Sequence, residues 1–400
     1  MINLEIPGKL QNVQNMARML AVQVFRPITR KYDKAEHEKP VELYPIAEML
    51  RSQMRGGEKK TGGEPSTATT MATKNGQNMM AVLGTAEMSW GDVAMGVATP
   101  GIGLGNAAIS AVGTPEQQEQ YGKLWCAMAI TEPGAGSDTA NLSTHARLDG
   151  EEWVLNGEKI YVTAGNFCDA VVVWATLDKT LGKRAIKSFI VPKGTPGMEV
   201  VRLEPKMGFR VSDTAAITFT DCRIPKANVL GSPEIAEDAK KALGGAMQTF
   251  DNTRPMVAAM SLGVARAALD LLLEMLAKED FVPGYDKSLW NASALEAEIY
   301  RMEADYEAAR LLALKAAWMA DNKLPNSKEA SMSKAKAGRM GNYVTLRCVE
   351  LCSTLGYSEE YLLEKFARDS KILDIFEGTQ QIQQLIVARQ VLGLSSSQLK

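Results

Sequence analysis

The chain has 400 residues, of which 46% are hydrophobic and 23% are charged, and its formal net charge is −2. This length is more than one compact core usually holds, so we expect two or three sub-domains of a globular protein. Acidic and basic residues are mixed along the sequence, which lacks the basic footprint of a protein that binds nucleic acid or an anionic membrane.

Cysteine and histidine usage narrows the classes of protein further. The five cysteines form no C-x-x-C pair, and neither a signal-peptide pattern nor an apolar stretch of membrane length is evident, so we expect a cytoplasmic protein. The two histidines, His37 and His145, lie in polar surroundings, where we expect solvated side chains. So few histidines argue against serine triads and His-ligated zinc, and we expect no metal site. An enzyme of this composition would use a carboxylate base or a cofactor.

Residues 1–125 have a helical pattern, with apolar residues returning every three or four positions, as in NVQNMARMLAVQVFRPITRKYD. The stretch 55–70, RGGEKKTGGEPSTATT, is polar and rich in glycine, which predicts a long mobile loop. GIGLGN at 101–106 looks like part of a nucleotide-binding motif, but no strand precedes it, so we expect a loop beside a helix.

Residues 126–235 have the alternation of β structure. EEWVLNGEKIYVT carries the pair Asn156–Gly157, the strongest short hairpin signal, and further strands are expected in DAVVVWATL, KSFIVP and AAITFTDCRIP. From 236 to 400 the helical period returns in long segments of a bundle, at 240–252, 256–278, 294–322 and 327–356. The predicted fold class is α+β, mainly α: an N-terminal helical domain, a middle antiparallel β domain and a C-terminal helical bundle.

Three motifs carry candidate functional residues. In TEPGAGSD (131–138), the hydroxyls of Thr131 and Ser137 lie beside glycines that let a ligand approach, although a tight loop explains the same residues. In KIYVTAG (159–165), Tyr161 and Thr163 are two apart, hence on one face of a strand, where they could wall a planar ring; an ordinary half-buried strand is the alternative. Glu377 heads the amphipathic run IFEGTQQIQ and would on spacing alone be a surface acid.

These motifs, with KMGFRVSD (206–213) and FDNTRP (250–255), resemble in order and spacing the acyl-CoA dehydrogenase family. The resemblance covers nearly the whole chain and is weakest before residue 80. It implies a helical N-terminal domain, a middle β domain and a C-terminal four-helix bundle that makes the oligomer. It also implies FAD, held between the β domain and the bundle. Acyl-CoA oxidases and nitroalkane oxidases share parts of the pattern.

The resemblance assigns roles to single residues. Glu377 matches the catalytic base, which removes the Cα proton of an acyl thioester while FAD accepts hydride from Cβ. Gly378 would leave room for the acyl chain and free the backbone amide of Glu377 to face the developing enolate oxygen. Desolvation should raise the pKa of Glu377 toward the working range. The other implied contacts are Thr131, Tyr161 and Thr163 with the flavin ring, Ser137 with flavin and CoA, Asp251 and Arg254 with CoA, and Thr379 and Gln381 with the flavin or its nucleotide.

Two segments depart from the family's pattern. Relatives carry an arginine and a threonine that reach the FAD pyrophosphate of a neighbouring subunit, where this chain has Glu279 and Phe281. The glutamine and two glycines that admit the same dinucleotide are replaced by Glu350, Ser353 and Thr354. An acid repels a pyrophosphate, so the half-site donated to the neighbour is lost while the half-site that the chain keeps for itself survives.

Two assemblies stay open. A homo-oligomer would bind FAD poorly or by other residues, whereas a paralogous subunit could supply the missing contacts in an α2β2 heterotetramer, as in family members that act on sterols and other bulky acyl-CoAs. The leading expectation is an acyl-CoA dehydrogenase subunit that forms a trans-2-enoyl-CoA and passes electrons to an electron-transfer flavoprotein. A non-catalytic structural or regulatory subunit and an acyl-CoA oxidase are the alternatives. The retained Glu377, Ser137 and Arg254 argue against a non-catalytic subunit.

Overall fold

The computed structural model describes residues 6–48, 76–101, 103–235, 244–395 and 398, without the side chains of 244–252 and Leu289. The predicted loop 55–70 lies outside the described residues. The helices are α1 (Gly8–Leu20), continued by a π-helical turn (Ala21–Phe25) into α2 (Arg26–Lys34), then α4 (Gln77–Ala98), α5 (Leu104–Val112), α6 (Pro115–Tyr121), α8 (Gly244–Lys278), α9 (Ala294–Asp321), α10 (Ser327–Leu351), α11 (Ser353–Tyr357), α12 (Leu363–Ser370) and α13 (Gln380–Leu392). The strands are β1 (Cys126–Ala129), β2 (His145–Asp149), β3 (Glu152–Thr163), β4 (Ala170–Thr176), β5 (Ile186–Pro192), β6 (Met198–Leu203) and β7 (Thr214–Pro225).

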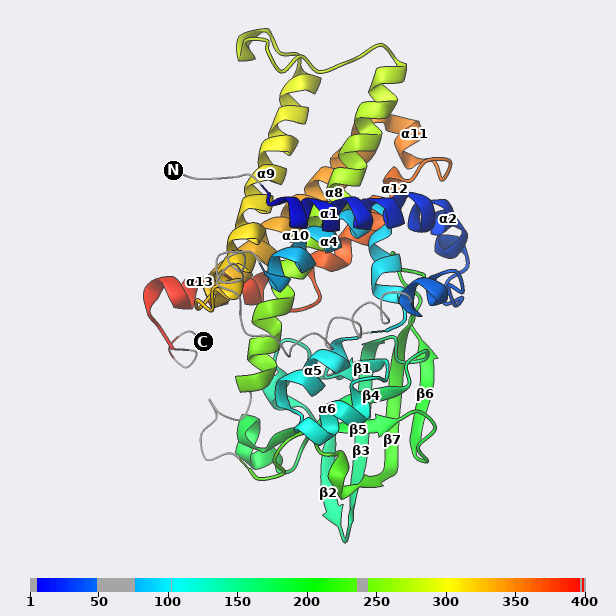
Figure 1. The fold of residues 1–400 in the computed structure, drawn as a ribbon, viewed down its shortest axis with the longest axis vertical. Helices are drawn as coiled ribbons and strands as arrows, with labels where there is room; N and C mark the ends of the chain where they lie inside the picture. Colours follow the sequence, from blue (N-terminus) through cyan, green and yellow to red (C-terminus); the bar gives the residue numbers. More distant parts are fainter. Residues whose placement is uncertain (1–5, 49–75, 102, 236–243, 396–397, 399–400) are drawn as a thin grey trace.

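The molecule has two parts stacked along its long axis, one made of most of the helices and the other of the sheet with α5 and α6 packed on it (Figure 1). Helices from both ends of the sequence share one hydrophobic core, because Phe25 of the N-terminal segment and Leu269 and Met340 of the C-terminal segment belong to the same buried cluster. The sheet has separate clusters on its two faces. The predicted order of helices, strands and helices is therefore confirmed, while domain boundaries at 125 and 235 stay a prediction.

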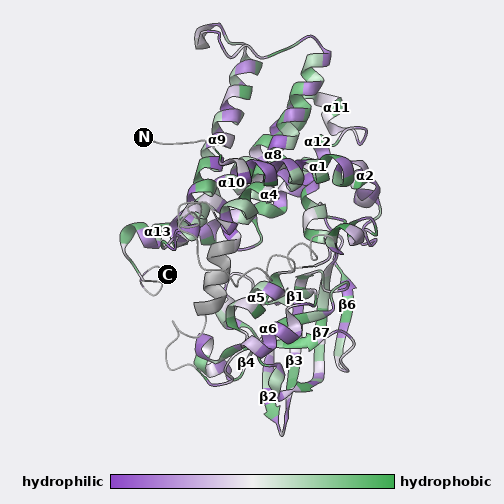
Figure 2. Cartoon of the chain, viewed as in Figure 1, coloured by the Kyte–Doolittle hydropathy of each residue, from purple (hydrophilic) through white to green (hydrophobic). Residues whose placement is uncertain are grey.

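Helix α8 is longer than predicted. The segments 240–252 and 256–278 were expected as two helices, but one helix runs from Gly244 to Lys278 with Pro255 inside it. Its portion Thr253–Lys278 contains an 18-residue window with a mean hydropathy of 1.7, enough by length and composition to cross a membrane, so the expectation that no stretch approaches that length was wrong. Since 67% of the apolar window is buried inside the protein, we interpret α8 as a core helix. Figure 2 shows hydrophobic and hydrophilic bands alternating along the neighbouring α9.

The sheet is mixed rather than antiparallel. Its strand order is β1-β4-β2-β3-β7-β6, with β5 paired to β4. β1 runs parallel to β4, whereas β3–β7, β4–β5 and β6–β7 are antiparallel pairs. Parallel pairing requires a crossover between the strands, and the TEPGAGSD loop, β2 and β3 lie between β1 and β4 in the sequence. The sheet thereby holds TEPGAGSD and KIYVTAG beside each other.

The hairpin predicted at Asn156–Gly157 is wrong. β3 runs through both residues, and the turn lies at Gly150, between the paired residues Asp149 and Glu152. Gly157 (φ 148°) instead sits at a register shift against β7, and an ideal Cβ there would lie 2.6 Å from Cα of Thr144. A bulge and the close approach of another segment's backbone explain why this position is a glycine, and local sequence reveals neither of them.

Gly157→Ala should therefore lower the free energy of unfolding by about 1–3 kcal/mol through overpacking against Thr144, in addition to backbone strain. Gly150→Ala is the matched control, because Gly150 (φ 64°) has nothing within 4 Å of an ideal Cβ and would suffer backbone strain alone. Urea unfolding of the two variants measures the difference. Equal losses would contradict the assignment of Gly157 to a close contact.

Three further local expectations can be compared with the structure. Of GIGLGN, expected as a loop beside a helix, Gly101 lies before α5 and Gly103 is its N-cap, whereas Leu104–Asn106 form its first turn, so that part of the prediction was wrong. The segment 327–356 was expected as one helix, but α10 ends at Leu351 and Ser353 has a left-handed φ of 51°. His145 is exposed, as expected, whereas His37 is half-buried and burial lowers its pKa, so the expectation of a solvated His37 was wrong.

Candidate functional site

The predicted site residues fall into two groups, the first of which lies at one end of the sheet. The loop TEPGAGSD follows β1, and the backbone carbonyl of Thr131 accepts a hydrogen bond from the amide of Ile160 at 2.9 Å. Thr131 is half-buried, and Ser137 is exposed on the same loop. The structure therefore brings Thr131 against the motif KIYVTAG.

A buried ion pair fixes this loop. Lys159 has no exposed surface, and its Nζ lies 2.7 Å from Oε1 of Glu132, which also accepts the backbone N–H of Thr144 at 2.9 Å. Burial lowers the pKa of Lys159 to about 8. At Glu132 burial alone would raise the pKa of the carboxyl, but hydrogen bonds from Lys159 and from neighbouring N–H groups outweigh it and hold that pKa below its usual range. Sequence reasoning missed both residues, although a lysine at an inward position of a strand was a signal.

The strand geometry at Tyr161 differs from the prediction. The pairing of β3 with β7 slips between Lys159 and Val162, and Tyr161 has a left-handed φ of 57°. Simple alternation therefore does not place Tyr161 and Thr163 on one face. Tyr161 is 62% exposed and Thr163 is half-buried opposite Thr214. A bulge that turns a bulky aromatic side chain outward is a feature common beside ligand sites.

The second group surrounds Glu377, which lies between the 3-10 helix Lys371–Asp374 and α13. Oε2 of Glu377 accepts a hydrogen bond from Oγ1 of Thr253, on α8, at 2.9 Å. Glu377 is half-buried rather than a surface acid, and burial raises the pKa of its carboxyl, although Thr253, Arg254 and Lys334 act in the opposite direction. A carboxyl with a raised pKa beside a polar orienting group has the character of a general base.

The backbone around Glu377 is left-handed. Glu377 has φ 57° and Gly378 has φ 91°, and Nε2 of Gln383 donates to both of their carbonyl oxygens, at 3.0 and 3.1 Å. Nζ of Lys334, on α10, donates to the carbonyl oxygen of Gly378 at 2.7 Å. Left-handed backbone at a non-glycine residue is costly and persists where surrounding contacts fix it. Thr253, Lys334 and Gln383 were all missed from sequence.

The remaining predicted residues near Glu377 have different settings. Arg254 is only 4% exposed and lies close to Ser331, with Nη1 3.5 Å from Oγ. Thr379 is the N-cap of α13, where its hydroxyl accepts the amide of Ile382 at 3.3 Å, and Gln381 is exposed in the first turn. The side chain of Asp251, on α8, lies outside the described residues. Their predicted contacts with CoA and the flavin nucleotide stay predictions.

The segment KMGFRVSD (206–213) joins the two groups. At one end, the carbonyl of Asp213 accepts the amide of Ala164, which follows Thr163. At the other, the ring of Phe209 packs edge-to-face on Phe376, with centroids 6.0 Å apart, directly before Glu377. The sheet group and the Glu377 group are thus connected through one loop.

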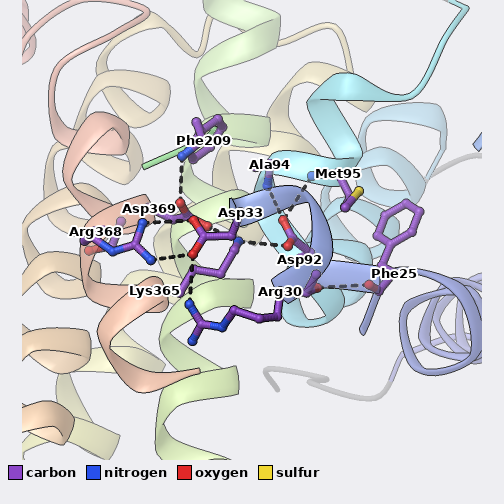
Figure 3. A network of polar contacts seen from close by, with 12 residues as sticks. Phe25, Arg30, Asp33, Asp92, Ala94, Met95, Phe209, Lys365, Arg368 and Asp369 are labelled. Atoms are coloured by element: carbon purple, nitrogen blue, oxygen red, sulfur yellow. Dashed lines mark hydrogen bonds and ion pairs between the residues drawn. The ribbon is translucent and has the colours of Figure 1, made fainter. Parts of the chain in front are cut away.

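A polar network holds that loop against the helices (Figure 3). The amide of Phe209 donates to Oδ1 of Asp369 at 2.7 Å, and Nζ of Lys365 lies 2.5 Å from the other oxygen of Asp369 and 2.8 Å from Asp92. Lys365, Asp369 and Asp92 are each at most 3% exposed. Beside them, Arg368 pairs with Asp33 at 2.6 Å, so α2, α4 and α12 are tied to the same loop.

The residues that depart from the family's pattern lie apart from Glu377 in the sequence. Glu279 and Glu350 are exposed, at the ends of α8 and α10. Phe281 packs on the helical core, and its amide donates to the carbonyl of Leu276. Ser353, where the resemblance implies a glycine, has a left-handed φ that glycine would adopt without strain.

The flavin ring and the diphosphate of FAD need different partners, so the residues are compared with each part of the cofactor in turn. The sheet group offers the hydroxyl of Thr131 and the outward ring of Tyr161. It also offers an open glycine loop, in which ideal Cβ atoms on Gly134 and Gly136 would meet nothing within 4 Å. These groups suit the edge and face of an aromatic ring system. The acids Glu279 and Glu350 do not suit a pyrophosphate. The residues of the sheet group therefore fit the ring half of FAD, whereas Glu279 and Glu350, at positions where the resemblance implies diphosphate contacts, do not fit the diphosphate half.

Comparisons with known proteins bear on this arrangement. Family models described as "Acyl-CoA dehydrogenase, middle domain" and "Acyl-CoA dehydrogenase, C-terminal domain" match residues 127–222 and 243–392. The chain is 32% identical over 403 residues to the short-chain specific acyl-CoA dehydrogenase of human mitochondria, covering 98% of this chain and 92% of that protein.

Solved structures agree. Butyryl-CoA dehydrogenase from Megasphaera elsdenii matches with a TM-score of 0.83 at 29% identity, covering 98% of this chain and 100% of that chain. A chain in the structure described as the electron transferring flavoprotein of Acidaminococcus fermentans matches with a TM-score of 0.81 at 31% identity, with coverage of 98% and 100%. The chain therefore belongs to the acyl-CoA dehydrogenase family of FAD-dependent oxidoreductases.

Proposed function

We propose that this chain is the catalytic subunit of an acyl-CoA dehydrogenase, which converts an acyl-CoA thioester to the trans-2-enoyl-CoA. The observation that carries the proposal is the half-buried carboxyl of Glu377, which has a raised pKa, accepts a hydrogen bond from Thr253 and sits on a fixed left-handed turn. The similar proteins from human mitochondria and Megasphaera elsdenii are named for short-chain acyl-CoA substrates, which supports an acyl-CoA thioester as the substrate class.

In the proposed reaction, Glu377 takes the proton from Cα of the thioester, and the electron pair of that bond forms the Cα–Cβ double bond. FAD bound beside the sheet group would supply the acceptor for the hydride that leaves Cβ. The pKa of Glu377 lies above its usual range, which makes the carboxylate a stronger base than a solvated glutamate. The left-handed turn aims the backbone amide of Glu377, which we assign to the thioester oxygen as negative charge develops there.

The residues assigned to the flavin ring are Thr131, Tyr161 and Thr163, with Ser137 between flavin and CoA and Thr379 and Gln381 toward the nucleotide. Asp251, Arg254 and Gly378 are assigned to the substrate. We also assign reoxidation of the flavin to an electron-transfer flavoprotein and the site of action to the cytoplasm. The described cysteines are free thiols, which supports a reducing compartment.

We further propose that the working assembly contains a paralogous subunit in an α2β2 heterotetramer. The loop that carries Glu279 also exposes Val282 (73%) and Trp290 (96%), apolar side chains that a partner subunit would cover. An apolar groove of about 940 Å³ lies between α9, α10 and α13. A partner that covers these surfaces and supplies an arginine in place of Glu279 would complete the diphosphate site.

The test is to purify the chain alone and together with a co-encoded paralogue, and to record flavin absorbance. Anaerobic bleaching by a panel of saturated acyl-CoAs, from butyryl-CoA upward, then measures dehydrogenation. Flavin colour and bleaching only with the partner support both proposals. Equal colour and bleaching from the chain alone contradict the partner proposal and leave dehydrogenation standing.

The same experiment separates the alternative functions. Bound flavin that no acyl-CoA bleaches would contradict the dehydrogenase proposal and favour a non-catalytic subunit. Rapid recovery of colour when oxygen is admitted would instead identify an oxidase.

A further inference from the structure

The turn that carries Glu377 is held by side chains from other elements. Its two left-handed residues, Glu377 and Gly378, direct their carbonyl oxygens at donors: Gln383 reaches both, and Lys334 reaches the second at 2.7 Å. A left-handed conformation is unfavourable for a non-glycine residue. The conformation of the turn therefore depends on these hydrogen bonds.

Lys334 is the unusual member of this set. It is 0% exposed, on α10, and its hydrogen bond goes to a neutral carbonyl oxygen rather than to a carboxylate. Burial lowers the pKa of Lys334 to about 8. The charged groups that act on Lys334 are Asp374 and Glu377, which favour its charge, and Arg254 of α8, which opposes it. A buried lysine is expensive for a fold to keep, so its contact with the turn needs an explanation.

We propose that Lys334 is a positioning residue of the reaction, whose ammonium group clamps the carbonyl of Gly378 and thereby holds the Glu377 turn in its left-handed conformation. Its charge also favours the carboxylate form of Glu377, together with that of Arg254. This inference rests on the proposed function, in which Glu377 is the base. Lys334 thus contributes a hydrogen bond to the turn and a charge beside Glu377. The hydrogen bond is tested by amide exchange in the turn, and the charge is tested by the pH dependence of flavin bleaching.

The charge contribution has a definite sign. Loss of a nearby cation disfavours the carboxylate, so the pKa of Glu377 should rise further when Lys334 is neutral. The rate of flavin bleaching depends on ionised Glu377, so its acidic limb should move to higher pH. We expect Lys334→Met to move that limb upward by about one pH unit and to slow bleaching at neutral pH by roughly 10- to 100-fold. Lys334→Arg keeps the charge and should leave the limb near its original place.

The hydrogen-bond contribution is measured without catalysis. Amide hydrogen exchange of a peptide that contains 374–380 should be faster in Lys334→Met than in the parent protein, because the turn loses a donor. Lys328→Met is the matched control, since Lys328 lies on the same helix and its side chain is 42% exposed. It should change neither exchange in the turn nor the pH profile.

The experiment uses the flavin-loaded protein, with its partner if the partner is required. Faster exchange with an upward shift of the acidic limb supports the proposal, and an unchanged turn with an unchanged limb overturns it. If Lys334→Met does not fold, Lys334→Gln decides, because an amide still donates to the carbonyl but carries no charge: a shifted limb supports the proposal and an unshifted limb contradicts it. If Glu377→Gln bleaches normally, the assignment of Glu377 as the base fails instead, while hydrogen exchange still reports whether Lys334 holds the turn.

Discussion

Glu377→Gln should slow the bleaching of bound flavin by acyl-CoA by roughly 10²- to 10⁴-fold, the range in which a positioned general base contributes to a rate. The amide has nearly the same shape and still accepts a hydrogen bond from Thr253, which lies 2.9 Å from the carboxylate, so the turn should survive. Flavin content should be unchanged. Stopped-flow absorbance of the flavin-loaded protein mixed with acyl-CoA measures the rate.

The matched control is Glu360→Gln, which removes an exposed carboxylate from the same part of the chain. It should bleach at the rate of the parent protein. Full-speed bleaching by Glu377→Gln would mean that another group takes the Cα proton. A loss of flavin from Glu377→Gln would instead assign the residue to cofactor binding.

The same substitution should change stability with a definite dependence on pH. Burial raises the pKa of Glu377 in the folded state, so between its unfolded and folded pKa values the folded chain binds more protons than the unfolded chain. The contribution of this group to stability is therefore full below the unfolded pKa and is lost as pH rises through the folded pKa. Relative to the parent, Glu377→Gln should gain stability from about pH 4 upward. Thermal unfolding across that range measures the trend, and the opposite trend would contradict a desolvated carboxyl.

The broad order of the fold could be predicted because hydrophobic period is a local property. Stretches with a period near 3.6 became α1, α9 and α10, and short apolar stretches separated by turn residues became β4, β5 and β7. The hairpin at Asn156–Gly157 failed because the same dipeptide that favours a turn also suits a bulge. Here the bulge forms rather than the turn. Thr144, from a neighbouring segment, approaches Gly157 too closely for any side chain at that position.

The site shows the same division. Glu377 was identified from its motif, and its half-buried state with a raised pKa is what the motif implied. Lys334 and Thr253 could not be found from spacing, because they lie on α10 and α8 and meet Glu377 only when the bundle packs. Glu132 lies in the motif TEPGAGSD and Lys159 lies in the motif KIYVTAG. They pair only because β3 packs against the TEPGAGSD loop in the folded chain. Side chains that orient a site are contributed by several elements, so a local pattern can point to Glu377 but not to the residues that contact its turn.

Lys365→Met should lower the free energy of unfolding by about 3–5 kcal/mol, the range for breaking a buried ion pair by removing one partner. Burial opposes the charge of Lys365, but Asp369 and Asp92 together hold the pKa of Lys365 above its ordinary value. Removing the ammonium leaves two buried carboxylates close to each other, with the amides of Ala94 and Phe209 among their remaining partners. Urea unfolding at a fixed FAD concentration measures the loss, because bound ligand adds to apparent stability.

The matched control is Lys371→Met, whose side chain is 52% exposed and lies 3.9 Å from Asp374, so its loss should stay within about 0.5 kcal/mol. The double variant Lys365→Met with Asp369→Asn removes one of the stranded charges and should recover part of the loss. Since Asp369 also accepts the amide of Phe209, Lys365→Met should loosen the 206–213 loop that joins the sheet to the Glu377 turn. Hydrogen exchange of that loop should therefore increase in Lys365→Met but not in Lys371→Met. A large loss of stability with unchanged exchange would restrict the network to holding the helices together.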